Sequence, residues 1–294
     1  ARVAREAPMM HAVEMAMSAN GLAQLQLAPP TALAALAKAA VPKLDQFGAL
    51  ELPQLLSALA SLDWHDEQLV RMAISRLPLL LADMDGKALS LTTAALASSE
   101  VWVPSAAHML AEEVADKALI FNARQASVTL GALANMRWGD TRAVDLLIRR
   151  VAECAREGKA SLTDIAVAVR ALSSAGQLEP TPEHSEHSEH SEHSEHSEGA
   201  RGGAALTAAT EDALFPLIDR ATAILNRRSA KLVRTQMAVA LPTAEDDAAA
   251  ARQRQQLSEE ALLADLSMLC NGLVQLNVTP PGELVAHTQA IVDT

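Results

Sequence analysis

Aromatic residues are scarce in this chain. Tyrosine is absent, and three phenylalanines and three tryptophans make up the whole aromatic content of 294 residues. Half of the residues are apolar, but alanine and leucine supply most of that fraction. Sheets are built from β-branched and aromatic residues, whereas alanine and leucine favour helices. The composition therefore excludes a sheet protein and predicts an all-α fold.

Cysteines and long apolar runs are also few. Cys154 and Cys270 lie in helical patterns without CxxC or Cys/His spacing, so we expect two buried, reduced thiols and no disulfide framework. No apolar run approaches the ~20 residues that cross a bilayer. Pro78 and Asp83 interrupt the most apolar stretch. We therefore expect a soluble protein with no membrane partner.

Motifs of the common catalytic classes are missing. No Gly-rich phosphate loop follows a strand, and neither G-x-S-x-G nor H-E-x-x-H occurs. We expect no enzymatic activity, no cofactor, no metal site and no small-molecule substrate.

Positive charge is in the minority. The formal net charge is −12, which argues against a surface coated in basic residues for nucleic acid. Six of the acidic residues lie in a tract of His-Ser-Glu units, residues 183–198, together with five of the nine histidines. A polar repeat of this kind cannot bury a core, so we predict a disordered insertion at residues 177–204. Metal capture by the histidines is the alternative interpretation of the tract.

Internal repetition is what the chain has in abundance. Residues 20–30 (NGLAQLQLAPP) and 271–281 (NGLVQLNVTPP) share seven of eleven residues. A leucine between small residues recurs through the chain at intervals of 37, 37, 37, 39 and 101 residues. These anchor leucines are Leu22, Leu59, Leu96, Leu133, Leu172 and Leu273. A fixed period in this range is typical of solenoid proteins.

Each anchor leucine belongs to a predicted amphipathic helix, which we name helix A. Around Leu59 the apolar residues are Leu52, Leu55, Leu56 and Leu62, at the i, i+3, i+4, i+7, i+10 spacing of one helix face. A tight turn follows, with Trp64, Trp102 or Trp138 in three units and Leu27 or Val278 in the end units. We interpret the tryptophans as plugs between helices, with a ligand-stacking platform as the alternative.

A second helix, helix B, starts after each turn. Residues suited to N-caps precede the predicted ranges 67–77, 106–114, 142–155 and 32–41. These predicted caps are Asp66, Ser105, Asp140 and Thr31. Every unit is thus a helical hairpin, and because one hairpin cannot bury its own apolar stripe, the units must stack.

The predicted architecture is a single right-handed α-solenoid over residues 1–294, with repeats of about 37 residues. It has six helix-turn-helix units, of which the end ones can be incomplete. The interval of 101 is explained by the insertion at residues 177–204 and a second at residues 228–257. We expect helix B of the fifth unit at residues 210–225, a short helix at 230–241 and the last helix A from residue 258. The end units look like interior repeats, so we expect the solenoid to continue or to dock at both ends.

Two sets of residues are candidates for binding. Two positions after each anchor leucine stands a polar residue, one per unit. This polar column is Gln24, Ser61, Ser98, Asn135, Ser174 and Gln275. It can present one hydrogen-bonding side chain per repeat, as helical-repeat proteins do for successive RNA bases. The alternative is that helix A ends here and takes a polar residue for that reason.

The second set is basic. Candidate phosphate contacts gather in the fourth unit and after the first insertion. They are Arg137, Arg142, Arg149, Arg150, Arg227, Arg228, Lys231 and Arg234, with Arg156 and Arg220 nearby. Acidic residues are interleaved with them, so surface ion pairs are the competing interpretation.

The period and the helix A motif, seen in residues 55–62 (LLSALASL) and 266–273 (LSMLCNGL), resemble the octotricopeptide and heptatricopeptide repeats. These are related to the helical repeats of RAP-domain and FAST-kinase-like proteins. The resemblance implies an organellar protein that acts on RNA, in some lineages as a subunit of mitochondrial ribosomes. No RAP domain is recognisable in this sequence.

The sequence thus predicts a non-catalytic mitochondrial protein, with the chloroplast as the alternative compartment. We expect it to bind RNA, foremost rRNA, or to brace rRNA and neighbouring proteins of a large complex. The competing hypothesis is a protein-only scaffold of the HEAT or armadillo kind, which grips a partner chain on its concave face.

Overall fold

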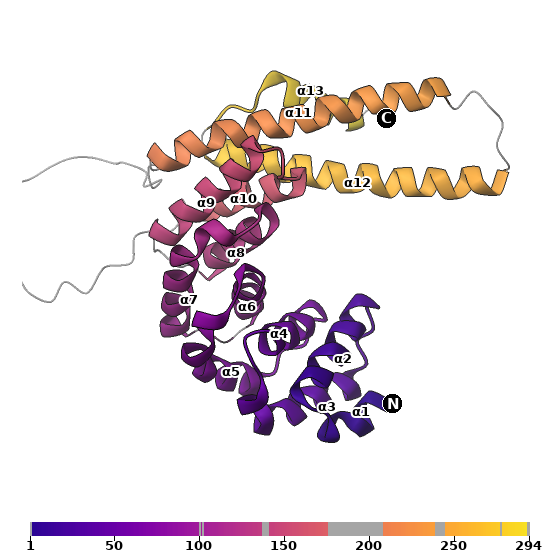
Figure 1. Cartoon of the computed structure of the whole chain (residues 1–294). Helices are drawn as coiled ribbons and strands as arrows, with labels where there is room; N and C mark the ends of the chain where they lie inside the picture. The colour runs from indigo at the N-terminus through magenta and orange to yellow at the C-terminus, as the bar shows by residue number, and fades with distance from the viewer. Residues whose placement is uncertain are drawn as a thin grey trace, which may run out of the picture.

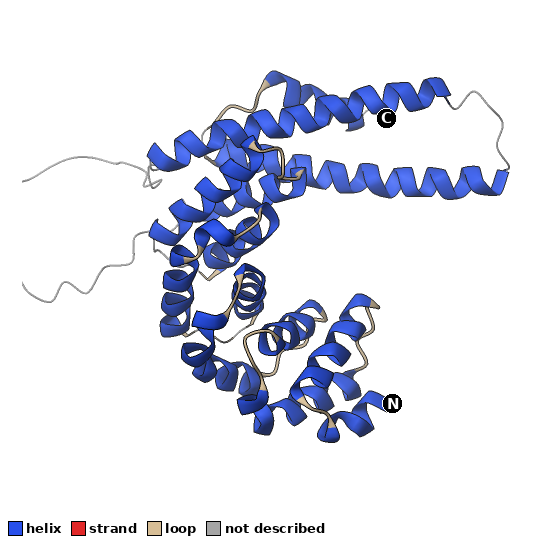
Figure 2. Ribbon diagram, viewed as in Figure 1, coloured by secondary structure: helices blue, strands red, loops and turns tan. Residues whose placement is uncertain are grey.

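The computed structural model describes residues 2–99, 101, 103–136, 141–175, 208–238, 245–276 and 278–292. Within these ranges, the side chains of residues 141, 175, 208–211, 228–238, 245–258 and 290–292 are not described. All elements in the described ranges are helices, joined by turns and loops (Figure 2). The predicted all-α fold class is therefore confirmed for this part of the chain.

Two sets of helices alternate along the chain. The A helices are α2 (Ala12–Gln24), α4 (Glu51–Ser61), α6 (Gly86–Ser98), α8 (Ala123–Asn135), α10 (Leu162–Ala175) and α12 (Glu245–Gln275). The B helices are α3 (Pro30–Ala40), α5 (Glu67–Leu80), α7 (Pro104–Asp116), α9 (Thr141–Arg156), α11 (Ala208–Ala238) and α13 (Gly282–Val292). A short α1 (Arg2–Glu6) precedes them. Four 3₁₀ turns are η1 (Ala7–Met9), η2 (Val41–Gln46), η3 (Leu81–Asp83) and η4 (Ala118–Ile120).

The helices pack neighbour to neighbour. Each A helix packs on the next A helix, from α2 through to α12. The B helices follow the same order, from α3 to α13, and α1 packs on α3. In Figure 1 the first units form a curve with α4 and α6 on its inner side and α5 and α7 on its outer side. This is a solenoid-like array in which each hairpin covers its neighbour.

The core of the array is the apolar stripe of the A helices. Five anchor leucines, from Leu59 to Leu273, are buried, whereas Leu22 in the first A helix is half-buried. Burial of one such side chain contributes roughly 1.5–3 kcal/mol. Because each stripe is covered by the adjacent A helices, the fold depends on stacking of consecutive units.

The linkers from a B helix to the next A helix share one design. The four described linkers, from α3–α4 to α9–α10, each contain a buried apolar side chain in the same register: Phe47, Met84 and Phe121 stand 37 residues apart, and Ala160 follows in the fifth unit. These side chains fill the space between successive hairpins, next to the start of the A helix. The linkers are therefore part of the core and not free loops.

In α6 and α8 a side-chain cap stands directly after this buried residue, whereas α4 has no side-chain cap. Asp85 accepts a hydrogen bond from the backbone N–H of Ala88 at 2.7 Å. Asn122 and Gln125 form a reciprocal pair, each accepting from the backbone N–H of the other, at 2.9 and 3.0 Å. Such caps satisfy backbone donors that a helix N-terminus leaves unpaired.

The starts of the B helices match the sequence prediction in one of three described cases. Asp66 caps α5, accepting from the backbone N–H of Leu69 at 2.8 Å. The predictions for Ser105 and Thr31 were wrong, because α7 and α3 begin two residues earlier than predicted, at Pro104 and Pro30, and have no side-chain cap. Proline suits the first helical position, since its ring fixes φ and no N–H is lost. Asp140 lies outside the described residues.

The helices around the second insertion are longer than predicted. Helix α11 covers Ala208–Ala238, so the short helix expected at 230–241 is largely a continuation of α11. Helix α12 begins at Glu245 and not near residue 258. Both extend away from the curved part of the array (Figure 1). The first insertion, residues 177–204, lies outside the described residues. No described helix is both long and apolar enough to span a bilayer.

Candidate functional site

The polar column lies at the C-terminal ends of the A helices. Five of its members are the last residue of their helix, and Ser174 is the last but one. All six side chains are exposed. The stacking of A helices thus presents one exposed polar residue per unit along one edge of the array, which we name the turn edge.

The serines and the amides of the polar column differ in their hydrogen bonds. The hydroxyls of Ser61, Ser98 and Ser174 donate to backbone carbonyls of their own helix, at 2.8, 2.9 and 3.1 Å. Their protons are therefore engaged at the helix end, as the alternative interpretation of the column expects. Gln24, Asn135 and Gln275 make no side-chain hydrogen bond to any other described residue and keep both donor and acceptor capacity.

The opposite edge of the array is formed by the linkers from B to A helices. We name this the linker edge. Basic side chains at this edge are engaged with the backbone of the chain itself. Half-buried basic side chains, each from a B helix or the turn after it, donate to backbone carbonyls of the preceding linker. We name these residues the linker clamps; they are Lys43, Arg76, Lys117, Arg150 and Arg220, of which Arg76 on α5 makes the longest contact, 3.4 Å from its Nη2 to the carbonyl oxygen of Asp45. Each clamp ties the second helix of a hairpin, or the turn after it, to the linker that precedes that hairpin.

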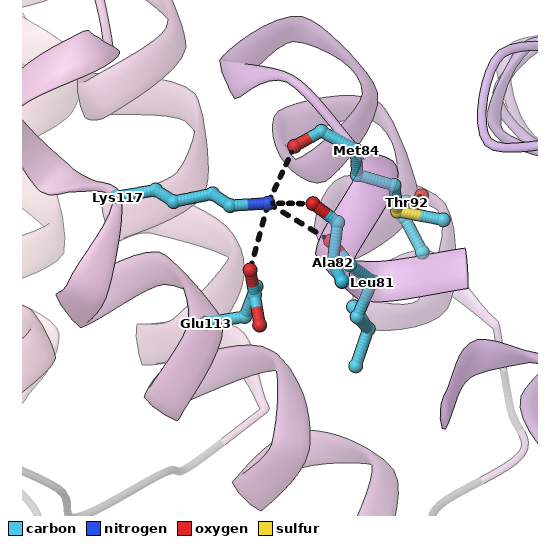
Figure 3. A network of polar contacts seen from close by, with 6 residues as sticks. All are labelled: Leu81, Ala82, Met84, Thr92, Glu113 and Lys117. Atoms are coloured by element: carbon cyan, nitrogen blue, oxygen red, sulfur yellow. Dashed lines mark hydrogen bonds and ion pairs between the residues drawn. The ribbon is translucent and has the colours of Figure 1, made fainter. Parts of the chain in front are cut away.

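Lys117 shows the arrangement in most detail (Figure 3). Its ammonium group lies 3.0, 2.8 and 2.9 Å from the carbonyl oxygens of Leu81, Ala82 and Met84. The carboxylate of Glu113, one turn earlier on α7, lies 2.7 Å from the same nitrogen. The three carbonyls belong to η3 and the residue after it, and that of Leu81 also accepts from the backbone N–H of Met84 at 3.1 Å. One cation therefore gathers three backbone acceptors of a single turn.

Other clamps make the same kind of contact to backbone carbonyls, through the ammonium group of Lys43 and the guanidinium group of Arg220. Lys43 donates to the carbonyls of Pro8 and Met10 at 2.7 and 2.8 Å. Arg220 on α11 donates to the carbonyl of Gly158, and to that of Ala160 at 3.3 Å. Gly158 has a φ of +77°, a conformation that glycine adopts without strain.

The clamps change the interpretation of Arg150, a candidate phosphate contact. Its Nε donates to the carbonyl of Phe121 at 2.7 Å, and its Nη1 pairs with Glu153 at 3.1 Å. Arg142 is likewise engaged within the chain, because it pairs with Asp116 on α7 at 2.8 Å. Both guanidinium groups have structural partners, so we do not place them on the proposed binding surface.

The structure describes the side chains of only some of the remaining basic candidates. Arg149 and Arg227 are exposed on α9 and α11. Arg137 lies outside the described residues. Arg228, Lys231 and Arg234 belong to α11, but their side chains are not described.

Comparison with known proteins does not assign the chain to a family. No protein-family model matches the chain, and no curated protein is significantly similar to it. The resemblance to octotricopeptide repeats therefore stays a hypothesis based on the residues quoted above.

The tryptophans and cysteines have structural surroundings where they are described. Trp64 is half-buried and packs against the core between α4, α5 and α6, as predicted for a plug, whereas Leu27 at the matching place is exposed. Trp102 and Trp138 lie outside the described residues. Cys154 is buried and Cys270 half-buried, and burial raises the pKa of both thiols. Neither is poised as a nucleophile at neutral pH.

Sequence reasoning missed the linker clamps. Their spacing is irregular, because Lys43 and Lys117 lie just after their B helices while Arg150 and Arg220 lie within them. The buried linker residues were easier to find. Phe47, Met84 and Phe121 keep the same interval as the anchor leucines, and that register would have revealed them.

Proposed function

We propose that the chain is a non-catalytic, RNA-binding helical-repeat protein of an organelle, foremost a subunit associated with the mitochondrial ribosome. In this proposal it is a right-handed α-solenoid with repeats of about 37 residues, related to the octotricopeptide and heptatricopeptide proteins. It takes no cofactor and no small-molecule substrate, and it contacts rRNA and neighbouring proteins.

The observation that supports this proposal best is the turn edge. Six stacked A helices end in exposed polar side chains, and three of these are amides whose donors and acceptors are not used by other described residues. Amide side chains suit the edges of unpaired bases, because both offer donors and acceptors. The acidic net charge limits non-specific attraction to phosphates, so contacts to bases and to neighbouring proteins carry more of the binding.

The test begins with an RNA that the wild-type chain selects from a random single-stranded pool at low salt. The triple variant Gln24→Ala, Asn135→Ala and Gln275→Ala should bind this RNA roughly tenfold or more weakly, because each lost hydrogen bond contributes about 0.5–1.5 kcal/mol. A matched control removes an exposed amide at the linker edge, Gln46→Ala in η2, and should bind as the wild type does. If no RNA is enriched, the proposal of RNA binding fails.

A salt series measures the phosphate contribution separately. The logarithm of the association constant should fall with the logarithm of salt concentration, by about 0.7 for each phosphate contacted on a single strand. Arg149→Gln should reduce this slope by about that amount. Arg71→Gln serves as the control of equal charge, because Arg71 is exposed but pairs with Glu67 at 2.8 Å.

One observation favours the protein-only scaffold as a second candidate. Large apolar side chains in or beside the linkers are exposed: Met9 by 83%, Leu119 by 75% and Leu79 by 66%. Exposed apolar residues along one edge are typical of protein interfaces. Under this alternative, Leu119→Asp abolishes co-sedimentation of the chain with its native complex after nuclease treatment, while the triple amide variant still co-sediments.

A further inference from the structure

The three phenylalanines of the chain fall into two classes. Phe47 and Phe121 occupy the buried linker position and are 1% and 0% exposed. Phe215, on the first half of α11, is outside that register and is 73% exposed. Its ring therefore adds nothing to the core of the described array. In a chain with so few aromatic residues, a ring held in solvent is a candidate for binding.

Phe215 lies at an open cleft of about 550 Å³ between α11 and the end of α9. Arg156 and Gly158 line it from the α9 side, and Asp219, Arg220 and Arg227 line it from α11. The cleft belongs to the linker edge, because Gly158 stands between α9 and α10. It is thus at the other end of the A helices from the polar column.

The charges of the cleft leave two arginines available. Arg220 is engaged as a linker clamp on the carbonyls of Gly158 and Ala160. Glu157 is held by Lys159 at 2.7 Å, and this hydrogen bond lowers the pKa of the carboxyl. Arg156 and Arg227 are exposed, and neither has a hydrogen bond or ion pair with another described residue. They face a single uncommitted acid in the lining, Asp219.

We infer that this cleft binds one nucleotide of single-stranded RNA, with the base stacked on Phe215 and the flanking phosphates contacted by Arg156 and Arg227. Base stacking on an exposed aromatic ring, combined with arginines that follow the backbone, is how proteins bind single strands without sequence preference. A protein-docking groove would expose several large apolar side chains. In this lining Phe215 is the one large apolar residue, beside Pro216 and two alanines.

This inference rests on the proposed RNA-binding function but names a second, sequence-tolerant contact. The whole chain is tested with a random-sequence single-stranded RNA pool at low salt. Phe215→Ala should weaken binding by about tenfold, since stacking on an aromatic ring is lost. Leu119→Ala is the matched control, because it also removes an exposed apolar side chain of the linker edge, and it should leave the affinity unchanged.

Two further variants identify the contact. Phe215→Trp should bind RNA as the wild type does. Its tryptophan fluorescence should be quenched by RNA more than that of the wild type, which has three other tryptophans, and the difference reports stacking at position 215. Phe215→Leu keeps apolar surface but not the flat ring, so it should bind as weakly as Phe215→Ala. Wild-type affinity in Phe215→Leu would instead indicate an apolar contact suited to a protein partner and would overturn the inference.

The two possible failures have different signatures. Equal binding of RNA by the wild type and by Phe215→Ala overturns the nucleotide site and leaves the proposed function standing. Absence of RNA binding by the wild type contradicts the proposed function as well. Folding is monitored by helical circular dichroism, which Phe215→Ala should not alter because the ring is exposed.

Discussion

The two edges of the array use polar chemistry for opposite purposes. At the linker edge, caps such as Asp85 and clamps such as Lys117 are engaged with backbone groups of the chain itself. At the turn edge, Gln24, Asn135 and Gln275 stay exposed and unengaged among the described residues. A solenoid must fix the angle between hairpins and still present a surface. Here the linkers carry the first task, and the surface is presented by the turns and, at the linker edge, by the cleft at Phe215.

The largest expected effect tests whether the linker edge is part of the core. Phe121→Ala should lower the free energy of unfolding by about 3–5 kcal/mol, because a fully buried ring is replaced by a cavity. Denaturant titration followed by circular dichroism measures the change. Phe215→Ala is the control with the same chemical change at an exposed site, and it should shift the midpoint little. Similar losses in both variants would show that the linker ring is not specifically important.

The next effect tests the clamp. Lys117→Met should destabilise the chain by about 1–3 kcal/mol, because three linker carbonyls lose their donor while the apolar stem is retained. Lys87→Met, at an exposed position of α6, removes the same charge from a side chain that makes no hydrogen bond or ion pair with another described residue, and it should be nearly neutral. Hydrogen exchange should also become faster in the linker of residues 81–85. A stable variant with unchanged exchange there would contradict the clamp.

A smaller effect is expected at the caps. Asn122→Ala should cost about 1 kcal/mol, because the N–H of Gln125 loses its acceptor at the start of α8. Asn122→Asp should retain most of the stability, since aspartate is an equally good cap. Thermal unfolding of the two variants, measured side by side, separates loss of the cap from a general effect of substitution.

The smallest effect belongs to the turn edge. Asn135→Ala and Gln24→Ala should change the free energy of unfolding by less than about 0.5 kcal/mol, as exposed substitutions usually do. The same variants should weaken RNA binding if the column acts as proposed. A clear loss of stability would mean that the amides serve to end the A helices, and the two edges would then differ less than we propose.

Much of the fold could be predicted from the sequence, because it depends on a local pattern. The stripe around Leu59 determines which helix face is buried, and the interval between anchor leucines predicts the stacking of units. The extent of α12 was misjudged for a different reason. Its first turns are rich in alanine, arginine and glutamine, which are strong helix formers, and the low apolar content was taken for a linker.

The candidate site was less predictable. The six polar residues were found by register, but their engagement depends on geometry: Ser61 donates to its own helix whereas Asn135 does not. Arg150 looked like a phosphate contact because a sequence shows its charge and not the carbonyl of Phe121 that it meets across the interface between hairpins. Phe215 was overlooked because nothing in a helical pattern distinguishes an exposed aromatic residue from a buried one.

The linker clamps also have a direction. Lys43, Lys117 and Arg150 all reach toward the N-terminus, to backbone synthesised about one repeat earlier. During translation the two helices of a hairpin can form as soon as they emerge. The carbonyls of the linker before that hairpin remain without the clamp until the lysine or arginine in or after the second helix has been synthesised. The clamp then joins the second helix of the hairpin to that linker. Where a clamp is present, a hairpin is therefore completed only after its lysine or arginine has been synthesised, so completion of the array proceeds stepwise from the N-terminus.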